Sequence, residues 1–248
     1  MKQQFEKYTA EDLAVWSTLF ERQIENLKHK ASRDYLAALE SMNAVLNPYQ
    51  LPHFGKINEW FSKHTGWEIA CVPGLIEVDE FFELLSEKKF PSSTWLRSKD
   101  KLDYLEEPDM FHDIFGHIPL LSNPGYSRFI HQFGILGKAH KNNPEILLQL
   151  QRLYWFTIEF GLISEGNELR IFGAGIISSF HESISSLSGS GEVVHHPFDA
   201  EQIIETDFCT SELQQNYFVL DHLAQLEQTI QILSKKYAHA LEPHSTSI

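Results

Sequence analysis

The segment EPDMFHDIFGHIPLL, residues 107–121, constrains this chain most, because it places His112 and His117 five residues apart among apolar side chains. A buried imidazole must be hydrogen-bonded or bound to a metal. On a regular α-helix, residues at this spacing lie about 140° apart around the axis, so they converge only where the helix ends or is distorted. Gly116 and Pro119 predict that the helix ends here. Two hydrogen-bonded core histidines at a helix end fit the pattern equally well.

The segment RLYWFTIEFGL, residues 152–162, contains a second unusual polar residue, because Glu159 stands between Ile158 and Phe160. A glutamate rarely enters a core without a partner, so a basic residue, a metal ion or a proton must compensate its charge. Two neutral imidazoles and one carboxylate would form the facial triad of non-haem iron(II) oxygenases, although zinc or manganese could occupy the same ligands. The H-E-x-x-H pattern of zinc proteases does not occur, which argues against the commonest zinc hydrolases.

Apolar residues at steps of three and four predict a mainly α-helical domain with a few short strands. The predicted helices cover residues 9–27, 35–46, 57–64, 79–88, 126–133, 144–162 and 220–241, and the predicted strands cover residues 68–72 and 169–172. The sequence has no internal repeat and no low-complexity linker, so we expect a single domain over residues 1–248. Its ordered core should cover about residues 9–240, followed by a flexible tail at 242–248.

The charge and the cysteine content limit which binding partners and which cell compartment we expect. The net charge is −14 and basic residues are scattered, so nucleic-acid binding is not expected. Cys71 and Cys209 form no Cys-x-x-Cys motif, which is typical of a reducing compartment. The N-terminus has no secretory h-region and no stretch approaches the roughly 18 apolar residues of a membrane span. We therefore expect a soluble cytoplasmic protein with small-molecule substrates and no membrane association.

Several long segments, in order along the chain, resemble a known family. EPDMFHDIFGHIPLL, LYWFTIEFGL and FGAGIISSF are similar to the signature segments of the tetrahydropterin-dependent aromatic amino acid hydroxylases, and TGWEIACVPGLI and FPSSTWLR extend the match. The chain most resembles the compact bacterial phenylalanine 4-hydroxylases. This resemblance implies a single catalytic domain of the hydroxylase type, without a regulatory or tetramerisation domain, and a monomer.

The resemblance implies a monooxygenase that hydroxylates the ring of L-phenylalanine to L-tyrosine with Fe(II), dioxygen and a tetrahydropterin. One alternative within the family is a tryptophan or broad aromatic amino acid hydroxylase. A zinc or manganese hydrolase that uses the same three ligands is an alternative from another class. A further alternative is a non-catalytic helical binding protein in which the histidines are structural.

The resemblance also assigns roles to individual residues. It makes His112, His117 and Glu159 the iron ligands, and Arg97 the group that binds the substrate carboxylate, as a bidentate guanidinium can. The other implied residues are Asp109, Trp155 and Ser178 for substrate binding, Gly74, Ile76 and Phe81 for the pterin, and Glu107 and Tyr154 for catalysis. Asp109 would lie near Arg97, and the Ser178 hydroxyl would orient a ligand histidine.

Overall fold

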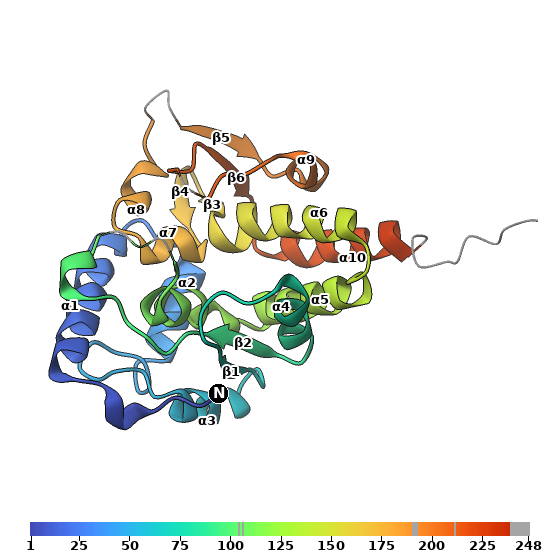
Figure 1. Cartoon of the computed structure of the whole chain (residues 1–248). Coiled ribbons are helices and arrows are strands. Elements are labelled where there is room, and N and C mark those ends of the chain that lie inside the picture. The colour runs from blue at the N-terminus through green and yellow to red at the C-terminus, as the bar shows by residue number, and fades with distance from the viewer. Residues whose placement is uncertain (104, 106, 190–192, 211, 239–248) are drawn as a thin grey trace, which may run out of the picture.

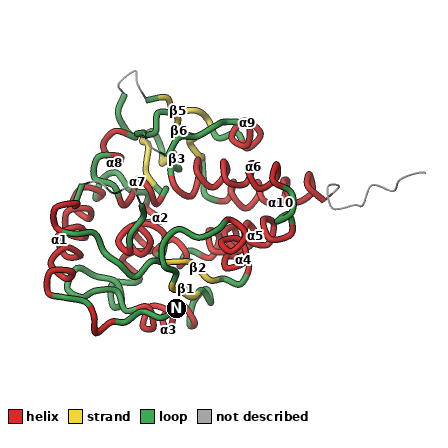
Figure 2. Tube along the Cα trace, in the orientation of Figure 1, coloured by secondary structure: helices red, strands yellow, loops and turns green. Residues whose placement is uncertain are grey.

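The computed structural model describes residues 1–103, 105, 107–189, 193–210 and 212–238. Helices dominate and the strands are short, so the predicted fold class is confirmed (Figures 1 and 2). The α-helices are α1 Ala10–Leu27, α2 Arg33–Ser41, α3 Phe54–Ser62, α4 Val78–Ser86, α5 Pro124–Ala139, α6 Pro144–Tyr154, α7 Ala174–Ser178, α8 Glu182–Ser185, α9 Ala200–Glu205 and α10 Ala224–Ala238. The strands are β1 Glu68–Cys71, β2 Lys89–Ser92, β3 Leu162–Glu165, β4 Glu168–Ile171, β5 Val194–Pro197 and β6 Asn216–Leu220.

Local capping explains where the long helices begin. At α1, the Thr9 side chain accepts from the Asp12 backbone N–H at 3.2 Å, and the Asp12 carboxylate accepts from the Thr9 N–H at 2.7 Å. This capping box satisfies two N–H groups that the helix leaves unpaired. At α6, Asn143 caps the helix and Pro144 occupies the first turn, where the N–H that proline lacks would be unpaired anyway.

The strands form two separate small sheets. Strands β1 and β2 pair in parallel, and the other four follow the order β4-β3-β6-β5, in which only β3 and β4 are antiparallel. The predicted strands near residues 68–72 and 169–172 correspond to β1 and β4. Figure 1 shows the four-stranded sheet at one end of the molecule and α6 between that sheet and the α4–α5 pair.

Both predicted helices that carry the unusual polar residues depart from regular α-helix. Of the two ways in which His112 and His117 could converge, a helix end or a distortion, the structure has the distortion: residues His112–His117 form a π-helical turn, and Ile118 keeps helical angles, so the expected helix end is not found there. The second helix does not continue to residue 162 either: α6 ends at Tyr154 and a π turn follows at Trp155–Glu159. Isolated π turns occur frequently at functional sites. Their i→i+5 hydrogen bonding brings residues five apart toward one face.

The core is one contiguous cluster of buried side chains that includes residues from both ends of the described chain, such as Val15 and Tyr237. Gly116 lies within this core, and a Cβ atom there would lie 2.9 Å from the Ala174 carbonyl oxygen, so glycine permits the close approach of α7. The predicted tail at residues 242–248 lies outside the described residues. None of the described helices combines the length and the apolar character that crossing a membrane requires.

Candidate metal and substrate site

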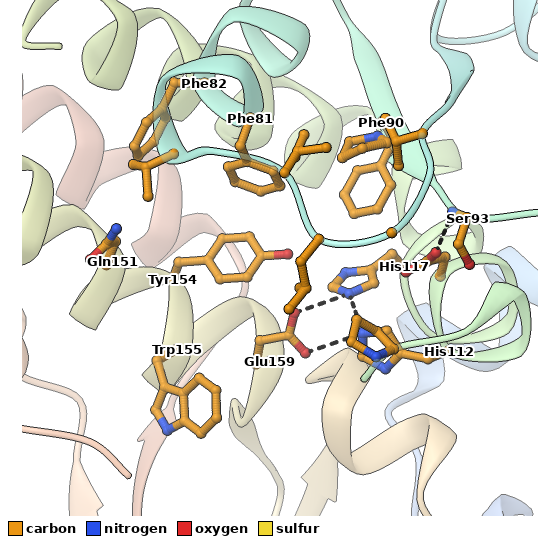
Figure 3. Close-up of a pocket in the computed structure, with 18 of the residues that line it drawn as sticks. Phe81, Phe82, Phe90, Ser93, His112, His117, Gln151, Tyr154, Trp155 and Glu159 are labelled. Atoms are coloured by element: carbon orange, nitrogen blue, oxygen red, sulfur yellow. Dashed lines mark hydrogen bonds and ion pairs between the residues drawn. The ribbon is translucent and has the colours of Figure 1, made fainter. Parts of the chain in front are cut away.

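The two π turns bring His112, His117 and Glu159 together, as Figure 3 shows. The Nε2 atoms of the two histidines lie 3.1 Å apart. Glu159 Oε1 is 3.1 Å from His117 Nε2, and Glu159 Oε2 is 3.7 Å from His112 Nε2. One donor atom from each side chain lies within 4.8 Å of the others. Three donors from two distant segments therefore point at one place.

The environment of His112 fixes which ring nitrogen is available. Ser178 Oγ donates to the Ala174 carbonyl at 2.9 Å, so its lone pair is free to accept from His112 Nδ1, 2.8 Å away. This network assigns the proton of His112 to Nδ1 and leaves the Nε2 lone pair directed at the other two residues. The structure thus places Ser178 beside a candidate ligand histidine, as the resemblance implied.

The charge state of the site suits a cation. Burial lowers the pKa of His112 to about 4, although the nearby Glu159 carboxylate opposes this shift. Burial alone would raise the pKa of Glu159, but the two imidazoles and the Tyr154 hydroxyl bring it down to about 2. At neutral pH the site therefore offers a neutral imidazole at His112 and an ionised carboxylate, the forms that bind a metal ion.

A cavity of about 390 Å³ opens beside these three residues. Its wall is mostly apolar, and the predicted pterin residues Gly74, Ile76 and Phe81 all line it. The Phe81 ring packs edge-on against Tyr154, with ring centroids 5.2 Å apart. The Tyr154 hydroxyl lies near the Glu159 carboxylate (Figure 3), close enough to help lower the pKa of Glu159. The cavity is large enough for small organic ligands next to the three donor atoms.

Arg97 and Asp109 form a buried ion pair beside the first π turn. The Asp109 carboxylate accepts from Arg97 Nε and Nη2, each at 2.9 Å, and also from the backbone N–H of Arg97 at 2.9 Å and of His112 at 3.1 Å. Asp109 therefore links the arginine to the first π turn. Arg97 is not among the described residues that line the cavity, and its Nη1 donates to the Leu102 carbonyl at 3.3 Å.

Trp155 also lines the cavity, and it lies next to Glu159 in the same π turn (Figure 3). Glu107 does not line the described part of the cavity, and unlike Arg97, Asp109 and Ser178, which do not line it either, its side chain is exposed. Its neighbour Pro108 does line the cavity.

Several further lining residues had no predicted role in the site, among them Ser93, Asp113, Gln151 and Phe208. Burial raises the pKa of Asp113 to about 7, and its carboxylate accepts from the Ser93 N–H at 2.8 Å. The position of Asp113 directly after His112 was a usable signal in the sequence. Phe208 gave none, because nothing in its neighbourhood links it to residues 107–121 or 152–162.

The donor set fits a non-haem iron centre. Two imidazole nitrogens and one carboxylate oxygen converge, and all three residues line the cavity, so other ligands can approach the same point. The Nδ1 atom of His117 is buried without a hydrogen-bond partner among the described residues, which leaves its Nε2 as the nitrogen directed at the site.

Comparison with known proteins identifies the family. The family model "Biopterin-dependent aromatic amino acid hydroxylase" matches residues 4–248. The phenylalanine-4-hydroxylase of Chromobacterium violaceum is 42% identical over 226 residues, which span 91% of this chain and 75% of the relative. The phenylalanine-4-hydroxylase of Pseudomonas aeruginosa is 42% identical over 228 residues, which span 92% of this chain and 84% of the relative.

Solved structures agree with these sequence matches. The crystal structure of the Chromobacterium violaceum phenylalanine hydroxylase bound to cobalt matches with a TM-score of 0.90 and 40% identity, covering 96% of this chain and 84% of that chain. The structure of the same enzyme with bound iron(III) and 7,8-dihydrobiopterin matches with a TM-score of 0.88 and 41% identity, and the match covers 97% of this chain and 86% of that chain. The chain therefore belongs to the biopterin-dependent aromatic amino acid hydroxylases.

Proposed function

We propose that this chain is a pterin-dependent non-haem iron monooxygenase that hydroxylates L-phenylalanine to L-tyrosine. The observation that carries the proposal is the convergence of His112, His117 and Glu159 beside an apolar cavity. The two bacterial relatives described above are both phenylalanine-4-hydroxylases, and each is 42% identical to this chain over the matched residues. When bound, Fe(II) and the tetrahydropterin supply the electrons that activate dioxygen for insertion into the ring.

The chain itself holds and orients the reactants. His112, His117 and Glu159 would hold the iron, and the Ser178 hydroxyl keeps the His112 proton on Nδ1 so that Nε2 stays available. The apolar cavity wall excludes water from the reacting groups. Phe81 and the segment with Gly74 and Ile76 would bind the flat pterin ring, and their place on the wall supports this role.

Substrate recognition is proposed for a second set of residues. Trp155 would form one wall of the pocket for the aromatic ring. Arg97, oriented by Asp109, would bind the carboxylate of the amino acid through the N–H groups that the ion pair does not use. The contact of Tyr154 with Glu159 supports a role for Tyr154 next to the iron. Glu107 is proposed to act in catalysis from the edge of the cavity, where its neighbour Pro108 lies.

The alternatives are less well supported. A tryptophan hydroxylase would share the site, but the relatives named above are phenylalanine hydroxylases. A zinc or manganese hydrolase would share the ligands, but the family match is to pterin-dependent hydroxylases. A non-catalytic protein would have no reason to align two imidazoles and a carboxylate on an open cavity.

The test is a product analysis with metal exchange. Protein loaded with Fe(II), Zn(II) or Mn(II) is mixed with a tetrahydropterin, air and either phenylalanine, tryptophan or tyrosine, and the products are separated by chromatography. We expect tyrosine from phenylalanine with Fe(II) only. Hydroxylated tryptophan as the main product would favour the first alternative, and no hydroxylated product from iron-loaded protein would refute the proposal.

We also propose that residues 1–248 act as one monomeric catalytic domain in the cytoplasm. The single contiguous core and the resemblance to compact bacterial enzymes support this proposal. Sedimentation equilibrium should give a mass near the 28.7 kDa of one chain. A mass of two or more chains would refute the monomer, and fractionation of cells would test the compartment.

A further inference from the structure

The Trp155 indole has one polar atom, and a residue 59 positions away in the sequence satisfies it. Trp155 Nε1 donates to Gln214 Oε1 at 3.0 Å. The indole N–H is the single hydrogen-bonding group of the ring and can only donate, so its partner must be an acceptor such as the Gln214 oxygen. Gln214 is only 8% exposed, which shields this hydrogen bond from competing water.

The Gln214 amide has a defined orientation. Its Nε2 donates to the Asn216 carbonyl at 2.7 Å, at the start of β6. If the amide were reversed, its NH₂ group would face the indole N–H and its oxygen would face the carbonyl, and both hydrogen bonds would be lost. The oxygen of Gln214 is therefore held toward Trp155.

Gln214 and Phe208 both belong to the chain between α9 and β6, and Phe208 gives this part of the chain a second contact with the Trp155 indole. The rings of Phe208 and Trp155 are stacked, with centroids 4.7 Å apart and planes 20° apart. Phe208 lines the same cavity as Trp155. Phe160 packs against the indole as well, at 4.5 Å between centroids. The indole is thus fixed by one directional hydrogen bond and two ring contacts.

This part of the chain is itself anchored to the rest of the fold. Arg152, one turn before Trp155, donates to the Ile204 carbonyl at 2.9 Å and forms an ion pair with Asp207. Gln215, the residue after Gln214, accepts from the Val194 backbone N–H at 2.8 Å, which ties the chain beside Gln214 to β5. Gln214 is therefore attached independently of Trp155, as a residue that orients another must be.

We propose that Gln214 is a positioning residue that fixes the orientation of the Trp155 indole, and that this orientation sets which aromatic ring the cavity accepts. The proposal rests on the proposed function, since it takes the cavity to bind an aromatic amino acid. Trp155 and Glu159 belong to one π turn, so the indole forms the wall next to the proposed metal site. In an apolar pocket, a difference of one methylene group in fit changes specificity by about 10–200-fold.

The first measurement needs only the full-length chain without substitutions. The hydrogen exchange of the Trp155 indole N–H is followed by ¹H–¹⁵N NMR, and a Trp155→Phe variant identifies its signal. We expect exchange clearly slower than that of a free indole, because the N–H is hydrogen-bonded to a buried amide. Exchange at the rate of a free indole would overturn the proposal.

A substitution then tests the link to specificity. Gln214→Met keeps the length of the side chain and removes both of its hydrogen bonds. We expect hydrogen exchange of the Trp155 indole N–H to become about fivefold faster, because one ordinary hydrogen bond is lost. The ratio of kcat/KM for phenylalanine to that for tryptophan should change by a similar factor, mainly through KM, with unchanged iron content. In a Trp155→Phe background the same substitution should change the ratio less than about twofold.

Gln149→Met is the matched control, because Gln149 accepts from the Tyr237 hydroxyl at 2.7 Å and does not line the cavity. We expect it to leave both readouts unchanged. Unchanged indole exchange in Gln214→Met would overturn the orienting role, and faster exchange with an unchanged substrate ratio would overturn the specificity role. If the wild-type protein hydroxylated no aromatic amino acid, the proposed function would fail, while the exchange data would still decide whether Gln214 orients the indole.

Discussion

Replacing Asp109 by alanine should be among the most destabilising single substitutions in this protein. Asp109 is fully buried, and its carboxylate accepts four hydrogen bonds, three from Arg97 and one from the backbone of His112. The Arg97 side chain is itself only 7% exposed. The substitution would therefore leave a buried guanidinium charge without its partner and would remove an acceptor from the first π turn.

The magnitude follows from the burial of the pair. Removing one member of a buried ion pair costs about 3–5 kcal/mol of unfolding free energy, because the remaining charge is uncompensated. For a chain of this size, that corresponds to a fall in Tm of about 6–20 °C. Removing both charges should cost less, so the Asp109→Ala/Arg97→Met protein should be more stable than Asp109→Ala by at least about 1 kcal/mol.

Urea denaturation followed by circular dichroism measures these free energies. Asp103→Ala is the matched control, because Asp103 also pairs with an arginine, Arg22, but is 64% exposed. An exposed pair of this kind contributes less than about 1 kcal/mol. If Asp109→Ala lost no more stability than Asp103→Ala, the buried pair would not stabilise the fold as argued.

Three further outcomes are expected. Ser178→Ala should weaken iron binding about 10–100-fold in a metal titration, because the ligand histidine loses the partner that fixes its tautomer; unchanged affinity would contradict this role. Gly134→Ala should cost about 1–3 kcal/mol in urea denaturation, because its Cβ would lie 2.5 Å from the Leu85 backbone, whereas Gly189→Ala meets nothing within 4 Å and should be neutral. Burial lowers the pKa of His140, so the unfolded chain binds more protons there and stability falls as the pH drops below about 6.5. His140→Leu should reduce the difference in unfolding free energy between about pH 7.5 and 5.5, and an equal difference in both proteins would contradict this assignment.

The sequence was most informative where polar residues interrupt apolar segments. His112, His117 and Glu159 stood out because an imidazole or a carboxylate in such surroundings needs a partner, and the structure brings all three together. The regular amphipathic helices were also predictable, since their apolar spacing and their caps are local features, as at Thr9 and Asp12.

The π turns and several strands could not be derived in the same way. A π turn is less favourable than an α turn in isolation, so it depends on tertiary contacts such as the packing of α7 on Gly116. Burial does not alternate from one residue to the next in strands β2, β5 and β6, so no period of two marks them in the sequence, and their pairing partners set them.

The contact between Trp155 and Gln214 shows the same limit at the level of single side chains. The two residues are 59 positions apart, and neither lies in a pattern that points to the other. Phe208 likewise reaches the cavity only because the chain between α9 and β6 folds back over the second π turn. Such contacts follow from the fold and appear only once the elements are placed.

The most direct test of the central claim is tyrosine formation by iron-loaded protein with phenylalanine, a tetrahydropterin and air, compared between wild type, Glu159→Gln and Glu168→Gln. Glu168 is an exposed glutamate paired with Arg170, so it controls for the loss of a carboxylate elsewhere. We expect iron binding and tyrosine formation by the wild type and Glu168→Gln, and loss of both in Glu159→Gln. Full tyrosine formation by Glu159→Gln would contradict the assignment of the metal site.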